Sequence, residues 1–247
     1  MAFKFFNNRK RLTDKFLGEQ ELGSPLVTFF KSNSNYAEEF RTLRVNLDFA
    51  QVDQNISNFL VTSSIPAEGK STIAANLAYT IAQTDKKVLI VDTDLRKPTL
   101  HRTFRLSNDS GLTTLLSNPN GEVGDYILRS PELKLSFLTS GPKPPNPAEL
   151  LQSARMTKVM NELKSYYDVI IYDCAPLNSV SDSQIMASKV EGVVLVVRPG
   201  YVERPEVRRA IESLKNVDAN ILGYVNNGLG SDREGYYGYN YGYTSEE

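Results

Sequence analysis

The sequence predicts an α/β domain with a doubly wound, mostly parallel sheet that is covered by helices on both faces. Short runs rich in β-branched residues alternate with segments whose apolar residues recur at helical spacing. One strand-like run also leads through a glycine-containing loop into an alanine-rich helical segment, as in nucleotide-binding sheets. Right-handed crossovers between successive strands then give the doubly wound arrangement.

The expected elements follow one another regularly from about residue 36 onward. The first helical segment places Phe40, Leu43 and Leu47 on one face. Further helices are expected at 71–83, 111–117, 147–153, 155–166, 182–190 and 205–216. Strands are expected at 59–61, 87–91, 134–138, 168–172, 192–197 and 221–225.

The chain is expected to form one large domain with two extensions. Its 247 residues, 40% of them hydrophobic, are enough to bury a full core. Residues 1–34 show no periodicity and are interpreted as an N-terminal extension. Residues 35–228 are expected to form the folded domain. Residues 229–247 are dominated by Gly, Tyr, Asn, Ser and Glu, which predicts a flexible tyrosine-rich tail.

Composition excludes several classes of function. The net charge of −1 gives no global basic field, so no nucleic-acid partner is expected. The single cysteine, Cys174, excludes an internal disulfide framework, fits a reducing compartment, and is interpreted as a small buried side chain. We predict neither a signal peptide nor a membrane span, and therefore a cytoplasmic protein. With His101 as the only histidine, a cluster of several histidines is excluded.

A phosphate-binding loop is predicted where the first strand meets the second helix. Lys70 and Ser71 supply the lysine and hydroxyl of a nucleotide P-loop, and Gly69 supplies a permissive backbone beside them. The usual first glycine is replaced by Ser64. A polar strand–helix turn is the alternative, but a lysine at a helix start opposes the helix dipole unless an anion lies nearby. The candidate nucleotide-binding residues of the loop are Ser64, Pro66, Ala67, Glu68, Gly69, Lys70, Ser71 and Thr72.

Three aspartates follow two other strands. Asp92 and Asp94 end the run VLIVDTD, and Asp173 ends VIIYD. Ligands collect beyond the carboxyl ends of parallel strands, and carboxylates gathered there would repel one another without a cation. We therefore predict a Mg²⁺ site formed by these aspartates and Ser71. Taken singly, each acid has a helix cap or turn role as its alternative.

Two basic residues, Arg96 and Lys97, directly follow the strand that ends in Asp92. They either bring positive charge to the site or to an acidic acceptor segment, or belong to a solvated loop. The residues themselves leave both interpretations open.

Together these motifs resemble the bacterial tyrosine kinases of capsular and exopolysaccharide biosynthesis, in the stand-alone cytoplasmic form of Gram-positive bacteria. The resemblance covers about residues 35–247 and includes SSIPAEGKST, VLIVDTDLRKP, VIIYDCAP, SGPKPPNPAELL, an ExxRxxR helix and the terminal tyrosines. It implies a P-loop NTPase of the deviant-Walker, partitioning-ATPase-like group. The partitioning ATPases carry an extra lysine where this chain has Ile65, Pro66 and Ala67, which favours the kinase branch.

The resemblance implies ATP as phosphate donor and tyrosine as acceptor. It places Lys70 on the phosphates and Ser71 on Mg²⁺, and it puts Asn226 or Asn227 near the adenine base, with Asn227 preferred. A tyrosine hydroxyl needs little help to lose its proton late in the reaction, so a carboxylate suffices. We nominate Asp92 as the group nearest the phenol and Asp94 as a metal or water holder, and these two roles are exchangeable. The catalytic set is Lys70, Asp92, Asp94 and Asp173.

Two further segments gain a meaning from the resemblance. Glu38, Arg41 and Arg44 form either an ordinary surface helix with one internal ion pair or a subunit contact that closes a homo-oligomeric ring. The tail is either merely sticky or the site of autophosphorylation in trans. The candidate acceptors are Tyr236, Tyr237, Tyr239, Tyr241 and Tyr243.

The partners that the resemblance implies are all proteins. A membrane-embedded activator of the polysaccharide co-polymerase type would recruit the kinase to the inner face of the plasma membrane, which the basic, aromatic N-terminus fits. Other protein tyrosines and a cognate phosphotyrosine phosphatase are also implied. The competing hypotheses are a nucleotide-switched positioning or scaffold ATPase without kinase activity, and a regulator of polysaccharide assembly in which nucleotide binding is only structural.

Overall fold

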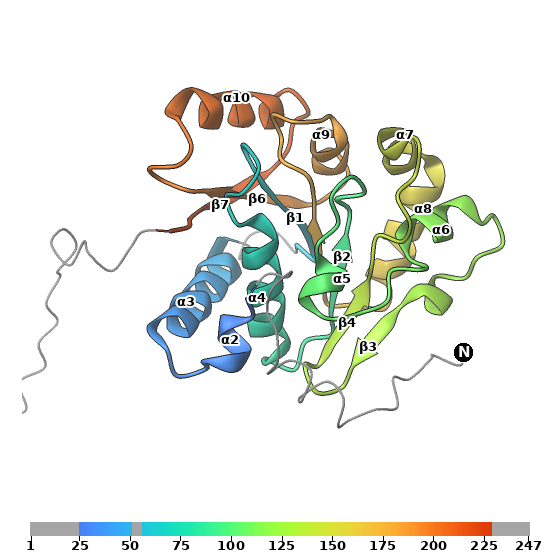
Figure 1. Ribbon diagram of the computed structural model, residues 1–247, viewed down its shortest axis with the longest axis horizontal. Coiled ribbons are helices and arrows are strands. Elements are labelled where there is room, and N and C mark those ends of the chain that lie inside the picture. The colour runs from blue at the N-terminus through green and yellow to red at the C-terminus, as the bar shows by residue number, and fades with distance from the viewer. Residues whose placement is uncertain (1–24, 51–55, 229–247) are drawn as a thin grey trace, which may run out of the picture.

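The computed structural model describes residues 25–50 and 56–228, which form a sheet between two layers of helices (Figure 1). The sheet has seven strands in the order β3-β4-β2-β5-β1-β6-β7. All neighbouring strands are parallel except the β3–β4 pair at one edge. The strands are β1 (Asn58–Ser63), β2 (Val88–Asp92), β3 (Leu128–Ser130), β4 (Leu135–Leu138), β5 (Val169–Asp173), β6 (Gly192–Val197) and β7 (Ile221–Asn226).

Helices cover both faces of this sheet (Figure 1). One face packs against α2 (Val27–Phe30), α3 (Asn35–Ala50), α4 (Lys70–Ala82) and α5 (Leu100–Thr103). The other face packs against α6 (Leu112–Ser117), η1 (Val123–Tyr126), α7 (Pro147–Gln152), α8 (Ala154–Lys164), α9 (Asp182–Ala187) and α10 (Arg204–Lys215).

The central strands are buried along their whole length, which explains their nearly continuous β-branched and apolar sequences. Every residue of β1, β2 and β5 is buried. Successive side chains serve opposite cores, since Phe59 and Val61 pack beneath α4 while Leu60 packs on the α8 side. The edge strand β7 is only partly covered, and its Tyr224 is 70% exposed.

The predicted fold class is confirmed, and each predicted helix and strand is present with ends shifted by a few residues. Four short elements were not predicted, namely α2, α5, η1 and β3. The strand β3 has three residues and pairs antiparallel to β4, so it is too short to show a period.

The packed part of the chain begins before the expected boundary at residue 35. Thr28 donates hydrogen bonds from its backbone N–H and its hydroxyl to Oδ1 of Asn76, at 3.0 and 2.9 Å. Leu26 is buried beside the same helix, α4. The predicted N-terminal extension up to residue 24 and the tail at 229–247 lie outside the described residues. Within the described ranges, no helix is both long and apolar enough to cross a membrane.

Candidate active site

The predicted phosphate loop and the three aspartates meet at the carboxyl ends of the central strands, because β2, β5 and β1 are adjacent in the sheet. Asp92 and Asp173 are paired across β2 and β5, and Asp173 also pairs with Val61 of β1. The loop that follows β1 leads into α4, whose first residue is Lys70. The carboxyl ends of three neighbouring strands therefore deliver the lysine and the acids to one place.

Lys70 supplies the positive charge among these acids in the structure. Its Nζ lies 3.0 Å from Oδ2 of Asp94 and 3.6 Å from Oδ1 of Asp173. Burial by itself would lower the pKa of Lys70, but the charges of Asp173 and Asp94 outweigh it and raise the pKa above its ordinary value. The ammonium group of Lys70 therefore neutralises part of the charge of Asp94 and Asp173, and the Mg²⁺ site stays a prediction.

Asp92 holds the turn that follows its own strand. Its Oδ1 accepts the N–H of Asp94 at 3.2 Å, and its Oδ2 accepts the N–H groups of Thr99 and Leu100, each at 3.1 Å. These contacts fix the start of α5, so Asp92 takes the turn role that was the alternative for each acid. Burial, and next the charge of Asp173, raise the pKa of Asp92 to about 8.

Asp173 is in the opposite situation. It is fully buried, and neither carboxylate oxygen forms a well-aligned hydrogen bond within the described residues, although the side chains of Lys70 and Ser71 lie close enough to lower its pKa. Burial raises the pKa of Asp173, while the positive charge of Lys70 opposes that shift. Buried polar atoms without partners are rare in native proteins and indicate a ligand, an ion or water at that position.

This arrangement fits a Mg²⁺ ion that arrives with a nucleotide. Among the described residues, no group of three or more His, Cys, Asp or Glu side chains is placed to hold a metal ion alone. Magnesium usually keeps several waters and binds one or two carboxylates together with phosphate oxygens. Asp173 and the buried hydroxyl of Ser71 supply protein ligands of that kind beside the phosphate loop.

The loop itself is held by contacts with the end of β7. Gly69 has a φ of +91°, which favours glycine, and a Cβ at this position would lie 2.1 Å from Nδ2 of Asn227 and would displace that side chain. The same Nδ2 donates a 2.8 Å hydrogen bond to the backbone oxygen of Glu68. Asn227 therefore lies against the loop.

Glu68 anchors the loop from within. Its fully buried carboxylate accepts the N–H of Ile65 at 2.8 Å and the N–H of Arg198 at 2.9 Å. The guanidinium of Arg198 also donates to the backbone oxygen of Ala67 at 3.4 Å. Sequence reasoning missed Arg198, although its position directly after a predicted strand places it at the same edge of the sheet.

The remaining loop residues occupy different environments. Pro66 and Ala67 are exposed, whereas Ser64 is buried and its hydroxyl has no hydrogen-bond partner among the described residues. The backbone oxygen of Thr72 accepts a hydrogen bond from Asn76, which ties the first turn of α4 to its second.

Comparisons with known proteins agree with this geometry. A family described as AAA domain matches residues 67–222. The tyrosine-protein kinase YwqD of Bacillus subtilis (strain 168) is 42% identical over 214 residues, which cover 87% of this chain and 90% of that protein. The putative tyrosine-protein kinase CapB of Staphylococcus aureus is 40% identical over 219 residues, with 89% and 96% covered. The chain belongs to the bacterial tyrosine kinases.

Solved structures of bacterial tyrosine kinases share the fold. The kinase domain of the Escherichia coli tyrosine kinase ETK matches with a TM-score of 0.81 and 31% identity, covering 94% of this chain and 91% of that one. A septum site-determining protein MinD complexed with Mg-ADP, from Pyrococcus horikoshii, matches with a TM-score of 0.57 at 22% identity, which shows a shared fold alone. The predicted family and fold class are confirmed, and the curated relatives are named as the predicted class of enzyme, tyrosine-protein kinases.

In this bacterial tyrosine kinase, Arg96 forms an ion pair within the chain. Neither a role at the site nor a solvated loop, the two interpretations of Arg96, predicted that contact. Its Nε and Nη2 donate to the two carboxylate oxygens of Asp182, at 2.9 and 3.1 Å. Asp182 is fully buried at the start of α9, so the fork compensates a buried charge. Lys97 is exposed, and its backbone N–H donates to Oδ1 of Asp94 at 2.9 Å, so the role of its side chain stays a prediction.

The ExxRxxR residues make contacts within the chain. Glu38 and Arg41 form an ion pair along α3, and Arg41 also donates to the backbone oxygen of Ser32 at 2.7 Å. Arg44 donates to the backbone oxygen of Thr80 at 3.4 Å. Their predicted role between subunits stays a prediction, as does the role of the tail tyrosines, which lie outside the described residues.

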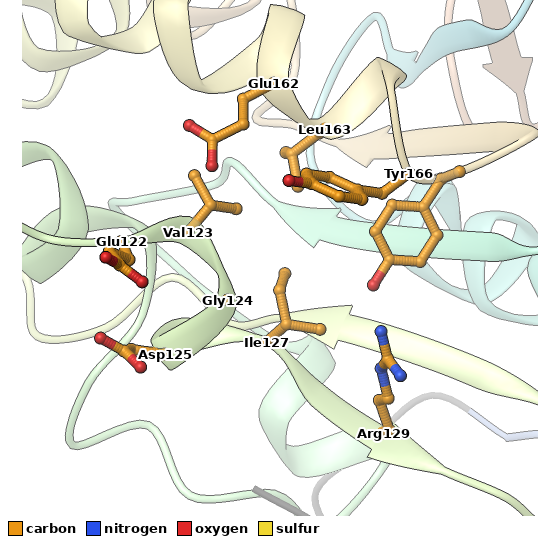
Figure 2. A pocket seen from close by; sticks show the side chains of 10 residues that line it. Glu122, Val123, Gly124, Asp125, Ile127, Arg129, Glu162, Leu163 and Tyr166 are labelled. Carbon is orange, nitrogen blue, oxygen red and sulfur yellow. The ribbon is translucent and has the colours of Figure 1, made fainter. Parts of the chain in front are cut away.

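A separate cavity lies between η1 and α8 along the β3 edge of the sheet (Figure 2). Glu122, Asp125 and Glu162 bring carboxylates to it, and Arg129 brings a guanidinium group (Figure 2). None of the predicted site residues lines this cavity.

The predicted burial of Cys174 is confirmed, and burial raises the pKa of its thiol to about 12.

Proposed function

We propose that this chain is an ATP-dependent protein-tyrosine kinase that phosphorylates its own tyrosine-rich tail in trans and regulates capsular or exopolysaccharide synthesis and export. The observation that supports it best is the cluster of Lys70, Asp94 and Asp173 at the end of the phosphate loop. Membership of the bacterial tyrosine kinases supplies the reaction class.

The loop and the start of α4 would hold the nucleotide. Backbone N–H groups at the helix start favour phosphate, and Gly69 lets the backbone approach closely. Lys70 would neutralise the phosphates, while Ser71 and Asp173 would hold Mg²⁺. Asn227, which already lies against the loop, is our candidate for the adenine side. When bound, Mg²⁺ and ATP supply the phosphoryl group and spread the charge that develops during its transfer.

The aspartates that follow β2 would orient the incoming phenol and receive its proton. With a pKa of about 8, Asp92 is suited to accept a proton near neutral pH, although its oxygens also bind three backbone N–H groups. Asp94 contacts Lys70 and leaves a small part of its side chain accessible. We keep both as candidates for the position nearest the phenol, with the other acting as metal or water holder.

Transfer in trans requires that two copies meet. We propose a ring in which Glu38, Arg41 and Arg44 contact the neighbouring subunit, since all three lie on α3 near the surface. Each added phosphate brings a charge of about −1.5 to −2, so several on one tail would repel one another and disfavour assembly. The unmodified tail would then promote the ring and the phosphorylated tail would dissolve it.

A separate membrane-embedded activator is proposed as the partner that brings the kinase to the inner face of the plasma membrane. The support comes from a longer relative, of which this chain matches only one part. Escherichia coli tyrosine-protein kinase etk is 31% identical over 231 residues, which cover 92% of this chain but only 32% of that protein. The remaining part of that relative would correspond to the proposed activator. Other protein tyrosines and a phosphotyrosine phosphatase complete the proposed set of partners.

A direct assay tests the kinase activity. Purified full chain is incubated with ATP and Mg²⁺ and followed by intact mass and phosphotyrosine antibodies. We expect successive gains of about 80 Da, one for each phosphate, within residues 236–243. The gains should vanish in Lys70→Met and persist in the matched control Lys158→Met, which changes an exposed lysine of α8. Phosphate release without any gain in mass would favour the positioning ATPase instead.

A mixing experiment tests transfer between copies. A chain ending at residue 228 serves as the enzyme without acceptors, and the Lys70→Met full chain serves as the acceptor without activity. Phosphate on the Lys70→Met chain demonstrates transfer in trans, and its absence from the mixture would contradict it. Native mass of the Glu38→Ala, Arg41→Ala and Arg44→Ala triple variant, and of phosphorylated and tail-deleted protein, tests the ring and its switch. An assembly unchanged by all three alterations rules out both.

A further inference from the structure

A groove with a basic rim lies between α10 and the loop that follows β6. Its apolar floor includes Val202, Val207 and Ile211, all half-buried. Its rim carries Arg204, Arg208 and Lys215, all exposed. The groove is separate from the nucleotide site, since none of the proposed nucleotide or metal ligands lines it.

The rim cations are not neutralised within the described part of the chain. No described carboxylate forms an ion pair with Arg204, Arg208 or Lys215. The only acidic side chain among the lining residues is Glu212. Arg209 differs, because it pairs with Glu206 at 3.3 Å and does not line the groove. Arginines four residues apart lie on one helical face, so Arg204 and Arg208 can grip one anionic group together.

The chain itself leaves the described structure beside this groove. A Cβ at Gly228 would lie 3.4 Å from Nε of Arg198, and Arg198 is followed by Pro199 and Gly200 of the groove. Tyr236 comes eight residues after Gly228, which allows a reach of roughly 26 Å. A helix the length of α10 spans about 18 Å. The tail tyrosines can therefore reach any part of the groove without unfolding the domain.

We propose that this groove binds the phosphotyrosine-bearing C-terminal segment of the same chain, an inference that rests on the proposed phosphorylation of that segment. A phosphate adds strong acceptor oxygens that arginine forks bind in pairs. The aromatic ring of the same residue would lie on the apolar floor formed by Val207 and Ile211. A tail bound in this way stays with its own chain and is withdrawn from the active sites of other copies.

Synthetic peptides test this binding directly. A fluorescent peptide of residues 233–247, phosphorylated on its five tyrosines during synthesis, is titrated against dephosphorylated full chain without ATP, and anisotropy is recorded. We expect the phosphopeptide to bind at least about tenfold more tightly than the unphosphorylated peptide, the size of one charge-assisted contact. The Arg204→Gln, Arg208→Gln double variant should lose roughly tenfold or more in affinity for the phosphopeptide.

The matched control is Arg209→Gln, which changes a cation of the same helix outside the groove and should bind as the wild type does. Equal binding by the double variant and the control would overturn the proposal. Equal binding of a scrambled phosphopeptide would also overturn it, because that result indicates charge attraction without a site. The phosphates come from synthesis, so a chain that binds the phosphopeptide yet shows no kinase activity would contradict the proposed function and leave this groove established.

Discussion

The ends of β2 and β5 carry the same residue in the same register but in opposite environments. Asp92 and Asp173 are paired neighbours, and both are fully buried. Asp92 accepts three backbone N–H groups, whereas Asp173 accepts none. An acid at a strand end can therefore serve the fold or a ligand, and its hydrogen bonds distinguish the two.

Lys70 sharpens this difference, because it contacts Asp94 and Asp173 and not Asp92. Of these two acids only Asp173 has no backbone N–H partner, because Oδ1 of Asp94 accepts the N–H of Lys97. In this respect Glu68 resembles Asp92, since both of its oxygens are used by backbone N–H groups. The site combines two acids that hold loops with two that face the lysine.

The largest expected effect comes from exchanging the two paired aspartates for asparagine. Asp173→Asn should reduce phosphotransfer by about 10²-fold or more, because it removes charge from the reaction site, and should lower stability less than Asp92→Asn does, because it breaks no backbone hydrogen bond. Asp92→Asn should lower the free energy of unfolding by about 1–3 kcal/mol, because an amide cannot accept all three N–H groups. Denaturant unfolding and phosphotyrosine formation are measured on both at pH 6. Equal losses of stability would contradict the comparison.

A second effect is expected in the pH dependence of stability. The folded pKa of Asp92 is about 8, well above the ordinary value near ~4 of an unfolded aspartate, so the folded state holds the extra proton between these values. Its stabilising contribution is complete below about pH 4 and is lost as the pH rises through about 8, with a slope of at most ~1.4 kcal/mol per pH unit.

Unfolding measured from pH 5 to pH 8.5 checks this dependence. The wild type should lose stability over this range more steeply than Asp92→Asn, which has no proton to release at that position. Parallel curves for the two proteins would show that burial does not shift the titration of Asp92.

The smallest effect is expected at Glu68. Glu68→Gln keeps one acceptor oxygen and loses the other, so we expect a loss of about 1 kcal/mol in stability. Hydrogen exchange should quicken at the amides of Ile65 and Arg198, which Glu68 binds. Glu39→Gln, on the exposed side of α3, is the control and should change neither quantity. Unaltered exchange at both amides would show that Glu68 does not hold the loop.

The frame of the site was predictable because it depends on local patterns. Continuous apolar runs that end in Asp92 and Asp173 predict buried parallel strands, and parallel strands bring their carboxyl ends to one edge. The lysine of the loop follows from the strand–loop–helix pattern around Gly69. These signals lie within short stretches of sequence, so no tertiary information was needed.

The contacts within the site were not predictable, because they join residues far apart in the chain. Arg198 and Glu68 are 130 positions apart, and Arg96 and Asp182 are 86 apart. Nothing in the neighbourhood of Arg96 distinguishes a solvated arginine from one that compensates a buried aspartate. The contact between Lys70 and Asp94 also depends on how the start of α4 lies relative to the turn after β2, and hydrophobic periodicity does not predict this.

The three innermost strands act as a rigid foundation for the chemistry. They are covered by helices on both sides and flanked by further strands, so changes at the rim of the molecule reach them only weakly. Surface helices such as α3 and α10 can then change their side chains, and with them their docking partners, while the residues beside the phosphate loop keep their positions.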